Sequence, residues 1–302
     1  MSRTTESGLL LLDKAVGETS RRAAGQAARR VGAKKYGHLG TLDPFATGLL
    51  PVMLGRATRL AQYFPQIPKA YSAEVKLGAS TTTDDIEGEV LETAELPPLG
   101  ADQLQRAAAA FLGRIRQRPS AFSAVRIDGQ RAYKRARRGE VVEVPEREVD
   151  IHQLDLEVLA EDRLRLEVVC GSGTYIRSLA RDLASWLGSR GHLVALRRTR
   201  VGDWTAADSA PVESMPDRGV IGMGPALALC GAVVNLPAAA QLHLRQGKPL
   251  AALEELHMLE PGRYSLFCAS QPVALVEQDQ NQGWRYCLVL PEPQNREHVV
   301  GG

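Results

Sequence analysis

The stretch of residues 37–51, GHLGTLDPFATGLLP, constrains the fold of this chain more than any other. It contains one acid, Asp43, among glycines, prolines and threonines. Pro44 disfavours a helical conformation for Asp43, and Gly40 permits backbone angles that other residues resist. The apolar run 49–54 predicts a buried strand that anchors the loop. An Asp-Pro pair by itself also suits a turn or a helix cap, but the whole stretch indicates a carboxylate presented from a fixed loop, where catalytic groups often lie.

Charge is distributed unevenly along the chain. The net charge of the 302 residues is only +2, yet eleven Lys or Arg stand against three acids between Lys14 and Lys76. Between Ala251 and Val300 the balance is reversed, with three Arg against seven acids. Basic clusters occur at residues 21–35, 126–138 and 192–202. Solvated surface charge would explain any one cluster, but together they indicate an anionic partner for the first part of the molecule.

Length, apolar runs and cysteines limit the class of protein. A chain of this length is sufficient for two domains. No segment approaches the ~18 consecutive apolar residues of a membrane span, and residues 1–6 lack the apolar region of a signal peptide. We therefore expect a cytoplasmic protein without membrane contact. The four cysteines include no Cys-x-x-Cys pair, so we expect no metal site. The absence of dinucleotide and phosphate-loop fingerprints favours a protein without cofactors.

The hydrophobic patterns predict a mixture of strands and helices. Buried or alternating strands are expected at residues 8–14, 69–78, 149–156 and 163–168. A helix should begin after Thr19 and end at Arg30, and a second should follow Thr174. Residues 208–224 are rich in Pro, Gly, Ser and Asp, which is typical of a linker. The short strands after this linker indicate a small β-rich domain.

The residues around Asp43 resemble, almost letter for letter, the catalytic motif of the bacterial TruB-type tRNA pseudouridine-55 synthases. Further ordered matches lie at residues 69–78, 81–88, 118–139, 171–179 and 196–202, so that the resemblance covers about residues 8–202. It implies an α+β pseudouridine synthase fold with a mixed, largely antiparallel central sheet flanked by helices and loops. It also implies a catalytic domain at residues 1–230, with a thumb at about 119–147, and a PUA-like RNA-binding domain at residues 231–302.

The resemblance further implies an activity and a set of site residues. The reaction would isomerise uridine-55 in the T-arm of tRNA to pseudouridine, with Asp43 as catalytic nucleophile or base. Arg177 would pair with Asp43 and keep it ionised. The other substrate-binding residues would be Tyr71, Tyr175 and Leu196, with His38 as a candidate to fill the space left by a flipped base. Thumb residues expected to contact the RNA backbone are Arg126, Arg131, Lys134, Arg135, Arg137 and Arg138.

Several alternatives remain open at this level. Asp43 could attack C1′ or C6 or remove the C2′ proton. Asp84 and Asp85 are interpreted as structural rather than as a catalytic or metal-binding pair, and His38 could equally be a satisfied loop histidine. The chain departs from the family pattern at Ala15, where proline is usual, and at Phe122, where tyrosine is commoner. Rival functions are a guide-RNA-dependent dyskerin-type synthase and a tRNA-binding or folding chaperone. We expect a monomer with no obligate protein partner, binding the tRNA T-arm.

Overall fold

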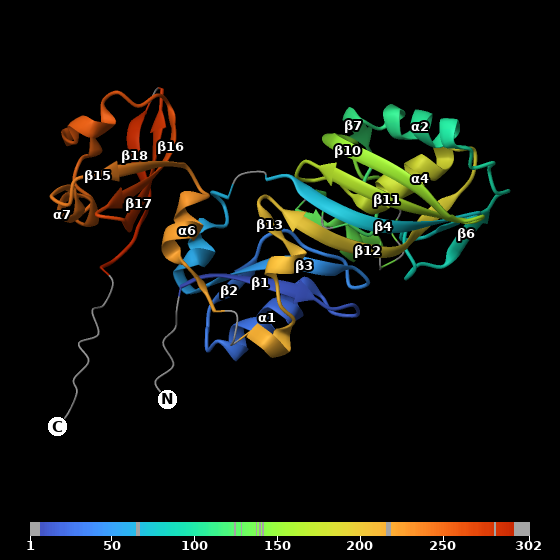
Figure 1. Ribbon diagram of the computed structural model, residues 1–302, viewed down its shortest axis with the longest axis horizontal. Coiled ribbons are helices and arrows are strands. Elements are labelled where there is room, and N and C mark those ends of the chain that lie inside the picture. The colour runs from blue at the N-terminus through green and yellow to red at the C-terminus, as the bar shows by residue number, and fades with distance from the viewer. Residues whose placement is uncertain are drawn as a thin grey trace.

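The computed structural model describes residues 7–64, 67–123, 125–127, 129–136, 138, 140, 142–215, 219–280 and 282–292. Over these residues the chain forms a ten-stranded sheet and a four-stranded sheet, with helix α6 (Met223–Ala228) lying between them (Figure 1). Within the described part of the chain, no helix has both the length and the apolar character needed to cross a bilayer.

The larger sheet is mixed and largely antiparallel, as predicted. Its strands follow the order β14 (Ile221–Gly222), β1 (Gly8–Lys14), β3 (Thr47–Leu54), β12 (Gly191–Val201), β4 (Lys69–Leu77), β11 (Arg163–Cys170), β10 (Arg147–Ala160) and β7 (Gly113–Gln117). In addition, β13 (Trp204–Thr205) pairs with β12, and β2 (Tyr36–His38) pairs with β3. The buried or alternating strands expected at residues 8–14, 69–78, 149–156 and 163–168 are therefore confirmed.

One pairing of this sheet matters most for the site. Strands β12 and β3 run parallel, with Arg197 opposite Thr47 and Arg198 opposite Gly48. The other strand pairs described in this sheet are antiparallel. Because the Asp43 loop leads into β3, this parallel contact places the end of the loop against the middle of β12. Residues separated by some 150 positions are thus brought together by topology.

Three helices cover one face of the larger sheet. Helix α1 (Ser20–Arg30) packs on β1 and β3, α4 (Ile176–Trp186) on β12 and β4, and α2 (Ala101–Ala110) on β10. Side chains on a strand alternate between faces, so Leu10 and Leu12 enter this core whereas Leu9 points to the opposite face. The helix predicted after Thr19 begins at Ser20, with the Thr19 hydroxyl accepting a capping hydrogen bond from the Arg22 N–H at 3.3 Å.

The second sheet lies beyond α6, which contacts β1 of the first sheet and β17 (Gln271–Asp279) of the second (Figure 1). It consists of β15 (Ala232–Leu236), β16 (Gly262–Cys268), β17 and β18 (Gly283–Val289), with α7 (Ala240–Arg245) packed on β17. Leu275 and Leu288 of this sheet join Leu9 and Met53 in one buried cluster. A domain boundary at residues 230/231 stays a prediction, since this shared apolar cluster joins the two sheets.

The segment predicted as a linker is more structured than expected. Strand β14 pairs with β1, and short 3-10 helices form at Ala206–Asp208 and Val212–Ser214. The Asp13 N–H donates to the Ala210 carbonyl at 2.9 Å, and the Ala210 N–H donates to the Leu11 carbonyl at 3.1 Å. The composition of residues 208–224 was misleading because β1 lies near the sheet edge, where its backbone groups still need hydrogen-bond partners.

Candidate active site

The first residue of α1, Ser20, holds the Asp43 loop through the backbone of Leu42. Ser20 is buried, and its hydroxyl accepts a hydrogen bond from the Leu42 N–H at 2.8 Å and donates one to the Leu42 carbonyl at 2.9 Å. On the other side of Asp43, the Gly17 N–H donates to the Pro44 carbonyl at 2.8 Å. The backbone on both sides of the acid is therefore held to elements that precede it in the chain.

Lys14 provides a third attachment for the same loop. Its side chain is 1% exposed, and its ammonium donates to the carbonyls of Ala46 at 2.6 Å, Ala15 at 2.8 Å and Pro44 at 3.2 Å. Burial lowers the pKa of Lys14 from 10.5 to about 8, against the opposing effect of nearby acids including Glu18. The loop thus depends on an ammonium group that titrates close to physiological pH.

Turnover should decline as the pH rises through about 8, where Lys14 loses its proton. The neutral amine has only two N–H donors for the three carbonyls that it contacts. A pH–rate profile on the RNA substrate tests this, and a flat profile to about pH 10, near the ordinary lysine pKa, would contradict it. Thermal unfolding provides the control. Because the folded-state pKa lies below the unfolded value, the contribution of Lys14 to stability rises between about pH 8 and 10.5, so unfolding would not explain the decline.

A second buried cation, Arg198 of β12, holds the loop from the opposite side. It is 1% exposed, and it donates through Nε to the Leu49 carbonyl at 2.7 Å and through Nη2 to the Gly40 carbonyl at 3.1 Å. Gly48 has a φ of +99°, and a Cβ there would lie 2.3 Å from the Arg198 carbonyl oxygen. Glycine at position 48 is therefore required both by the backbone angle and by this close approach.

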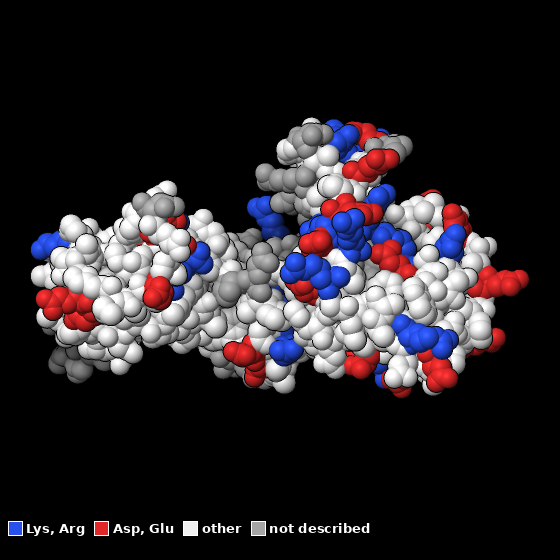
Figure 2. Space-filling model, turned by 90° about the horizontal axis from the view of Figure 1, so that it is seen from above, with Lys and Arg blue, Asp and Glu red and all other residues white. Residues whose placement is uncertain are grey.

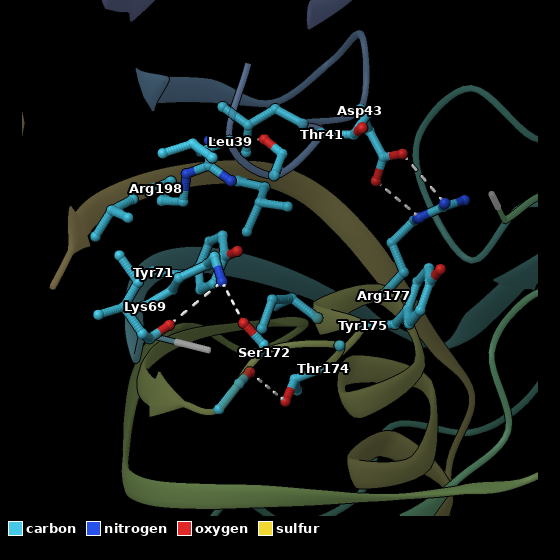
Figure 3. Close-up of a pocket in the computed structure, with 18 of the residues that line it drawn as sticks. Leu39, Thr41, Asp43, Lys69, Tyr71, Ser172, Thr174, Tyr175, Arg177 and Arg198 are labelled. Atoms are coloured by element: carbon cyan, nitrogen blue, oxygen red, sulfur yellow. Dashed lines mark hydrogen bonds and ion pairs between the residues drawn. The ribbon is translucent and has the colours of Figure 1, made fainter. Parts of the chain in front are cut away.

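Asp43 and Arg177 meet across the site (Figure 3). Arg177 lies in the first turn of α4, as predicted, and is 4% exposed. Its Nε lies 3.0 Å from Oδ2 of Asp43, and its Nη2 donates to Oδ1 at 3.2 Å. Contact through both carboxylate oxygens fixes the direction of the acid as well as its position.

Arg177 is itself held by a second carboxylate. Its Nη1 donates to Oδ2 of Asp85 at 3.2 Å and to the Thr83 carbonyl at 2.9 Å, and its Nη2 also donates to the Phe122 carbonyl at 3.2 Å. Asp85 is 2% exposed, and its Oδ1 accepts from the Glu87 N–H at 3.0 Å. Asp85 therefore acts on the site through Arg177 and is a positioning residue.

Asp84 points elsewhere, although it is adjacent to Asp85. Its φ is +60°, and its Oδ2 accepts from Nη1 of Arg181 at 2.9 Å. Burial raises the pKa of Asp84, and Arg181 opposes the shift. The two acids hold different arginines of α4, which agrees with interpreting them as structural.

The ionisation of Asp43 depends on opposing effects. Burial raises the pKa of its carboxyl, and Asp85 adds to this, whereas Arg177 and Lys14 lower it. Arg177 lowers the pKa in the direction expected from the sequence, but burial and Asp85 act against it. The side chain remains 33% exposed, and its two contacts with Arg177 require the ionised form. A carboxylate with a raised pKa is a better base than an ordinary one.

Asp43 opens into a cavity of about 430 Å³ that is also lined by Tyr71, Tyr175, Arg177 and Leu196. Figure 3 shows Tyr71 on one side of this cavity and the pair of Asp43 and Arg177 on the other. The volume lies within the ~300–1,000 Å³ of typical small-molecule sites. A single nucleotide is therefore the size of ligand that fits.

Four of the predicted substrate-binding residues converge here, and His38 does not line the cavity. Tyr71 and Leu196 are 8% and 7% exposed, and burial raises the pKa of Tyr71. The Arg147 guanidinium lies 4.7 Å from the centroid of the Tyr175 ring. His38 lies in β2, where its Nδ1 is buried without a partner among the described residues, and burial lowers its pKa.

The thumb is described only in part. Its backbone includes β8 (Arg126–Ile127), β9 (Gln130–Arg131) and α3 (Ala132–Ala136). Arg137 lies outside the described residues, as do the side chains of Arg126, Arg131 and Lys134. Arg135 and Arg138 both contact Glu140, at 2.7 and 3.0 Å. Figure 2 shows Lys and Arg around the base of a projection from the larger part of the molecule, interspersed with acids.

Comparison with known proteins gives a consistent result. The model of the TruB family pseudouridylate synthase N-terminal domain matches residues 28–176. A tRNA pseudouridine synthase B from Xanthomonas campestris is 48% identical over 208 residues, covering 69% of this chain and 68% of that protein. The Corynebacterium efficiens protein of the same name is 41% identical over 280 residues, or 90% of this chain and 92% of that one.

This chain belongs to the TruB family. It is accordingly a pseudouridine synthase, an RNA-modifying isomerase, as the sequence around Asp43 indicated. The TruB-type fold is also seen in a chain of the crystal structure of a Cbf5-Nop10-Gar1 complex. That chain aligns with a TM-score of 0.67 at 23% identity, over 89% of this chain and 78% of that one.

Sequence reasoning missed several residues of this TruB-family site. Lys14 was interpreted only as the end of a strand, and Arg198 only as part of a basic cluster. Lys69 lines the cavity but received no role. Gln117 is 1% exposed. Its Oε1 accepts a hydrogen bond from the Tyr175 N–H at 2.8 Å, and its Nε2 donates one to the Tyr175 carbonyl at 3.0 Å. For Lys14 the available signal was a charged residue at the end of an apolar run, since buried polar groups need partners.

Proposed function

We propose that this chain converts uridine-55 in the T-arm of tRNA to pseudouridine, with Asp43 as the group that starts the reaction. The observation that carries the proposal is the Asp43 carboxylate, held by Arg177 at the edge of a nucleotide-sized cavity. The relatives named tRNA pseudouridine synthase B support tRNA as the substrate.

The reaction is an isomerisation and needs no outside atom. The bond between N1 of uracil and C1′ of ribose breaks, the base rotates, and a bond forms between C5 and C1′. The proton on C5 leaves and N1 gains one, so that the formula is unchanged. Asp43 acts on the sugar or the base as nucleophile or base, by attack at C1′ or C6 or by removal of the C2′ proton.

The other residues bind and orient the uracil. A base inside a folded loop must be flipped out, which costs a few kcal/mol. Tyr71 offers a ring on which the flipped base stacks, worth about 1–3 kcal/mol, and Leu196 supplies an apolar contact. Because the pKa of Tyr71 is raised, its phenol is a poor base at neutral pH. We therefore assign Tyr71 to stacking, and proton removal from C5 to Asp43.

The deciding experiment uses an unmodified T-arm hairpin and the full-length protein. Incubation without other RNA or protein should yield pseudouridine at position 55 alone, as mapped by primer extension after carbodiimide treatment. Modification only after addition of a guide RNA would favour the dyskerin-type alternative. Tight binding without any pseudouridine would favour the chaperone alternative. Analytical ultracentrifugation of the active protein tests the proposed monomer.

The thumb arginines should contribute to the salt dependence of RNA binding. Replacing Arg135 and Arg138 by Gln should weaken binding and reduce the slope of log K against log salt by about 0.7 per lost contact. Binding titrations between about 50 and 200 mM salt measure the slope. Arg165 pairs with Glu157 on the sheet at 2.8 Å, so Arg165→Gln is the matched control with an unchanged slope. An unchanged slope in the double variant would show that these two arginines do not contact the RNA phosphates.

We also propose that residues 231–302 bind RNA as a PUA-like domain. Deleting them is a poor test, because Leu275 and Leu288 belong to the same buried cluster as Leu9 and Met53. Substitution of exposed side chains of the second sheet keeps this contact intact and separates RNA binding from folding.

A further inference from the structure

The cavity has a second polar end, away from Asp43. Lys69 lines it at the start of β4, where its ammonium donates to the Ser172 hydroxyl at 2.8 Å and to the Ile67 carbonyl at 3.3 Å. Figure 3 shows Lys69 beside Tyr71 and across the cavity from the Asp43–Arg177 pair. Lys69 and Tyr71 are two residues apart on one strand, so both side chains leave the same face.

A second positive charge lies close to Lys69. A Cβ built on Gly40 would lie 3.4 Å from Cε of Lys69 and 3.2 Å from Nη1 of Arg198. Gly40 has a φ of +77° and is exposed. Both cations therefore lie next to a solvent-exposed backbone position. A side chain at position 40 would fill this space.

These two cations have no acidic partner among the described residues. The hydrogen bonds of Lys69 go to a hydroxyl and a carbonyl. Those of Arg198 go to two carbonyls and to the Tyr71 hydroxyl. Burial and the charge of Arg198 lower the pKa of Lys69, with no carboxylate opposing them. The cavity contains one acid, Asp43, and that acid is bound by Arg177. Two adjacent uncompensated cations favour an anion rather than a neutral carbonyl group.

We propose that Lys69 and Ser172, with Arg198 behind them, bind a backbone phosphate next to the flipped uridine. The inference rests on the proposed function, because the anion that accompanies a base stacked on Tyr71 is a phosphodiester of the same strand. The third N–H of Lys69 and the Ser172 hydroxyl supply the donors. The site would hold the sugar at a fixed distance from Asp43.

The test pairs protein variants with hairpins that lack single charges. Three hairpins carry a neutral methylphosphonate on the 5′ side of the target uridine, on its 3′ side, or in the distal stem. Wild-type protein should bind one of the two flanking hairpins about tenfold more weakly and the stem hairpin normally. Lys69→Met should bind the native hairpin about tenfold more weakly than the wild type does. On the flanking hairpin that the wild type binds weakly, Lys69→Met and the wild type should have the same affinity. The salt slope of Lys69→Met should fall by about 0.7.

Two controls accompany the test. Lys76 lies on the same strand but the opposite face, so Lys76→Met should bind all hairpins as the wild type does. Ser172→Ala should show a smaller loss of affinity for the native hairpin, and this loss should likewise disappear when the same phosphate is neutral. If Lys69→Met proves unstable in thermal melts, Ser172→Ala provides the test.

The outcomes separate this inference from the proposed function. The phosphate site would be overturned if Lys69→Met lost as much affinity for the neutralised hairpins as for the native one. It would also be overturned if the wild type bound both flanking methylphosphonate hairpins as tightly as the native hairpin. Binding without pseudouridine formation would overturn the proposed function alone, because the binding comparison does not need turnover. No binding of the native hairpin by the wild type would overturn both.

Discussion

Replacement of Asp43 by Asn should lower turnover on the T-arm hairpin by about a thousandfold, the scale of a lost nucleophile or base. The affinity for the hairpin should stay within about twofold of wild type. Asn has nearly the same shape as Asp, and Arg177 retains its contacts with Asp85, Thr83 and Phe122. The fold is therefore preserved while the charge is lost. Single-turnover kinetics and binding titrations together measure the two effects.

Asp150 supplies the matched control for this variant. It is an aspartate paired with an arginine, Arg114, at 3.3 Å, but it lies on β10 and is 49% exposed. Asp150→Asn should leave both turnover and binding near wild type. Substantial turnover by Asp43→Asn would remove Asp43 from the chemistry, and an equal loss in Asp150→Asn would show that the assay reports general damage.

The parts of this fold that were predictable are those set by neighbouring residues. Strand β1 spans the expected residues because its apolar run ends at a polar turn. Helix α1 begins where Thr19 provides a cap and ends before Gly32, whose φ is +74°. The Asp43 loop was predictable for the same reason, since Gly40 permits a φ of +77° and Pro44 restricts the backbone of Asp43.

The parts that were not predictable depend on distant pairings. Arg198 reaches the Gly40 carbonyl across 158 positions, which requires the parallel contact of β12 with β3. Asp85 reaches Arg177 across 92 positions. Local patterns contain no information on which strands become neighbours, so Arg198 was only a member of a basic cluster, and the role of Lys69 could not be recognised.

Replacement of Arg177 by Gln should lower turnover about as much as Asp43→Asn does, and it should also destabilise the protein. Arg177 separates Asp43 from Asp85. Without the guanidinium, a buried carboxylate at Asp85 loses its partner, and removing one member of a buried pair typically costs about 3–5 kcal/mol. We expect a loss near the lower end, because Asp85 keeps the hydrogen bonds that it accepts from the Thr83 hydroxyl and the Glu87 N–H. Denaturant unfolding measures the stability, and single-turnover kinetics measure the activity.

A second substitution separates the two roles of this arginine. Adding Asp85→Asn to Arg177→Gln removes the unpaired buried charge, so the double variant should regain most of the lost stability. Its turnover should stay low, because Asp43 still lacks the cation that orients it and lowers its pKa. Recovery of turnover together with stability would mean that Arg177 only supports the fold. Stability regained without turnover would place Arg177 in the catalytic machinery with Asp43, and would leave Asp85 as the residue that positions it.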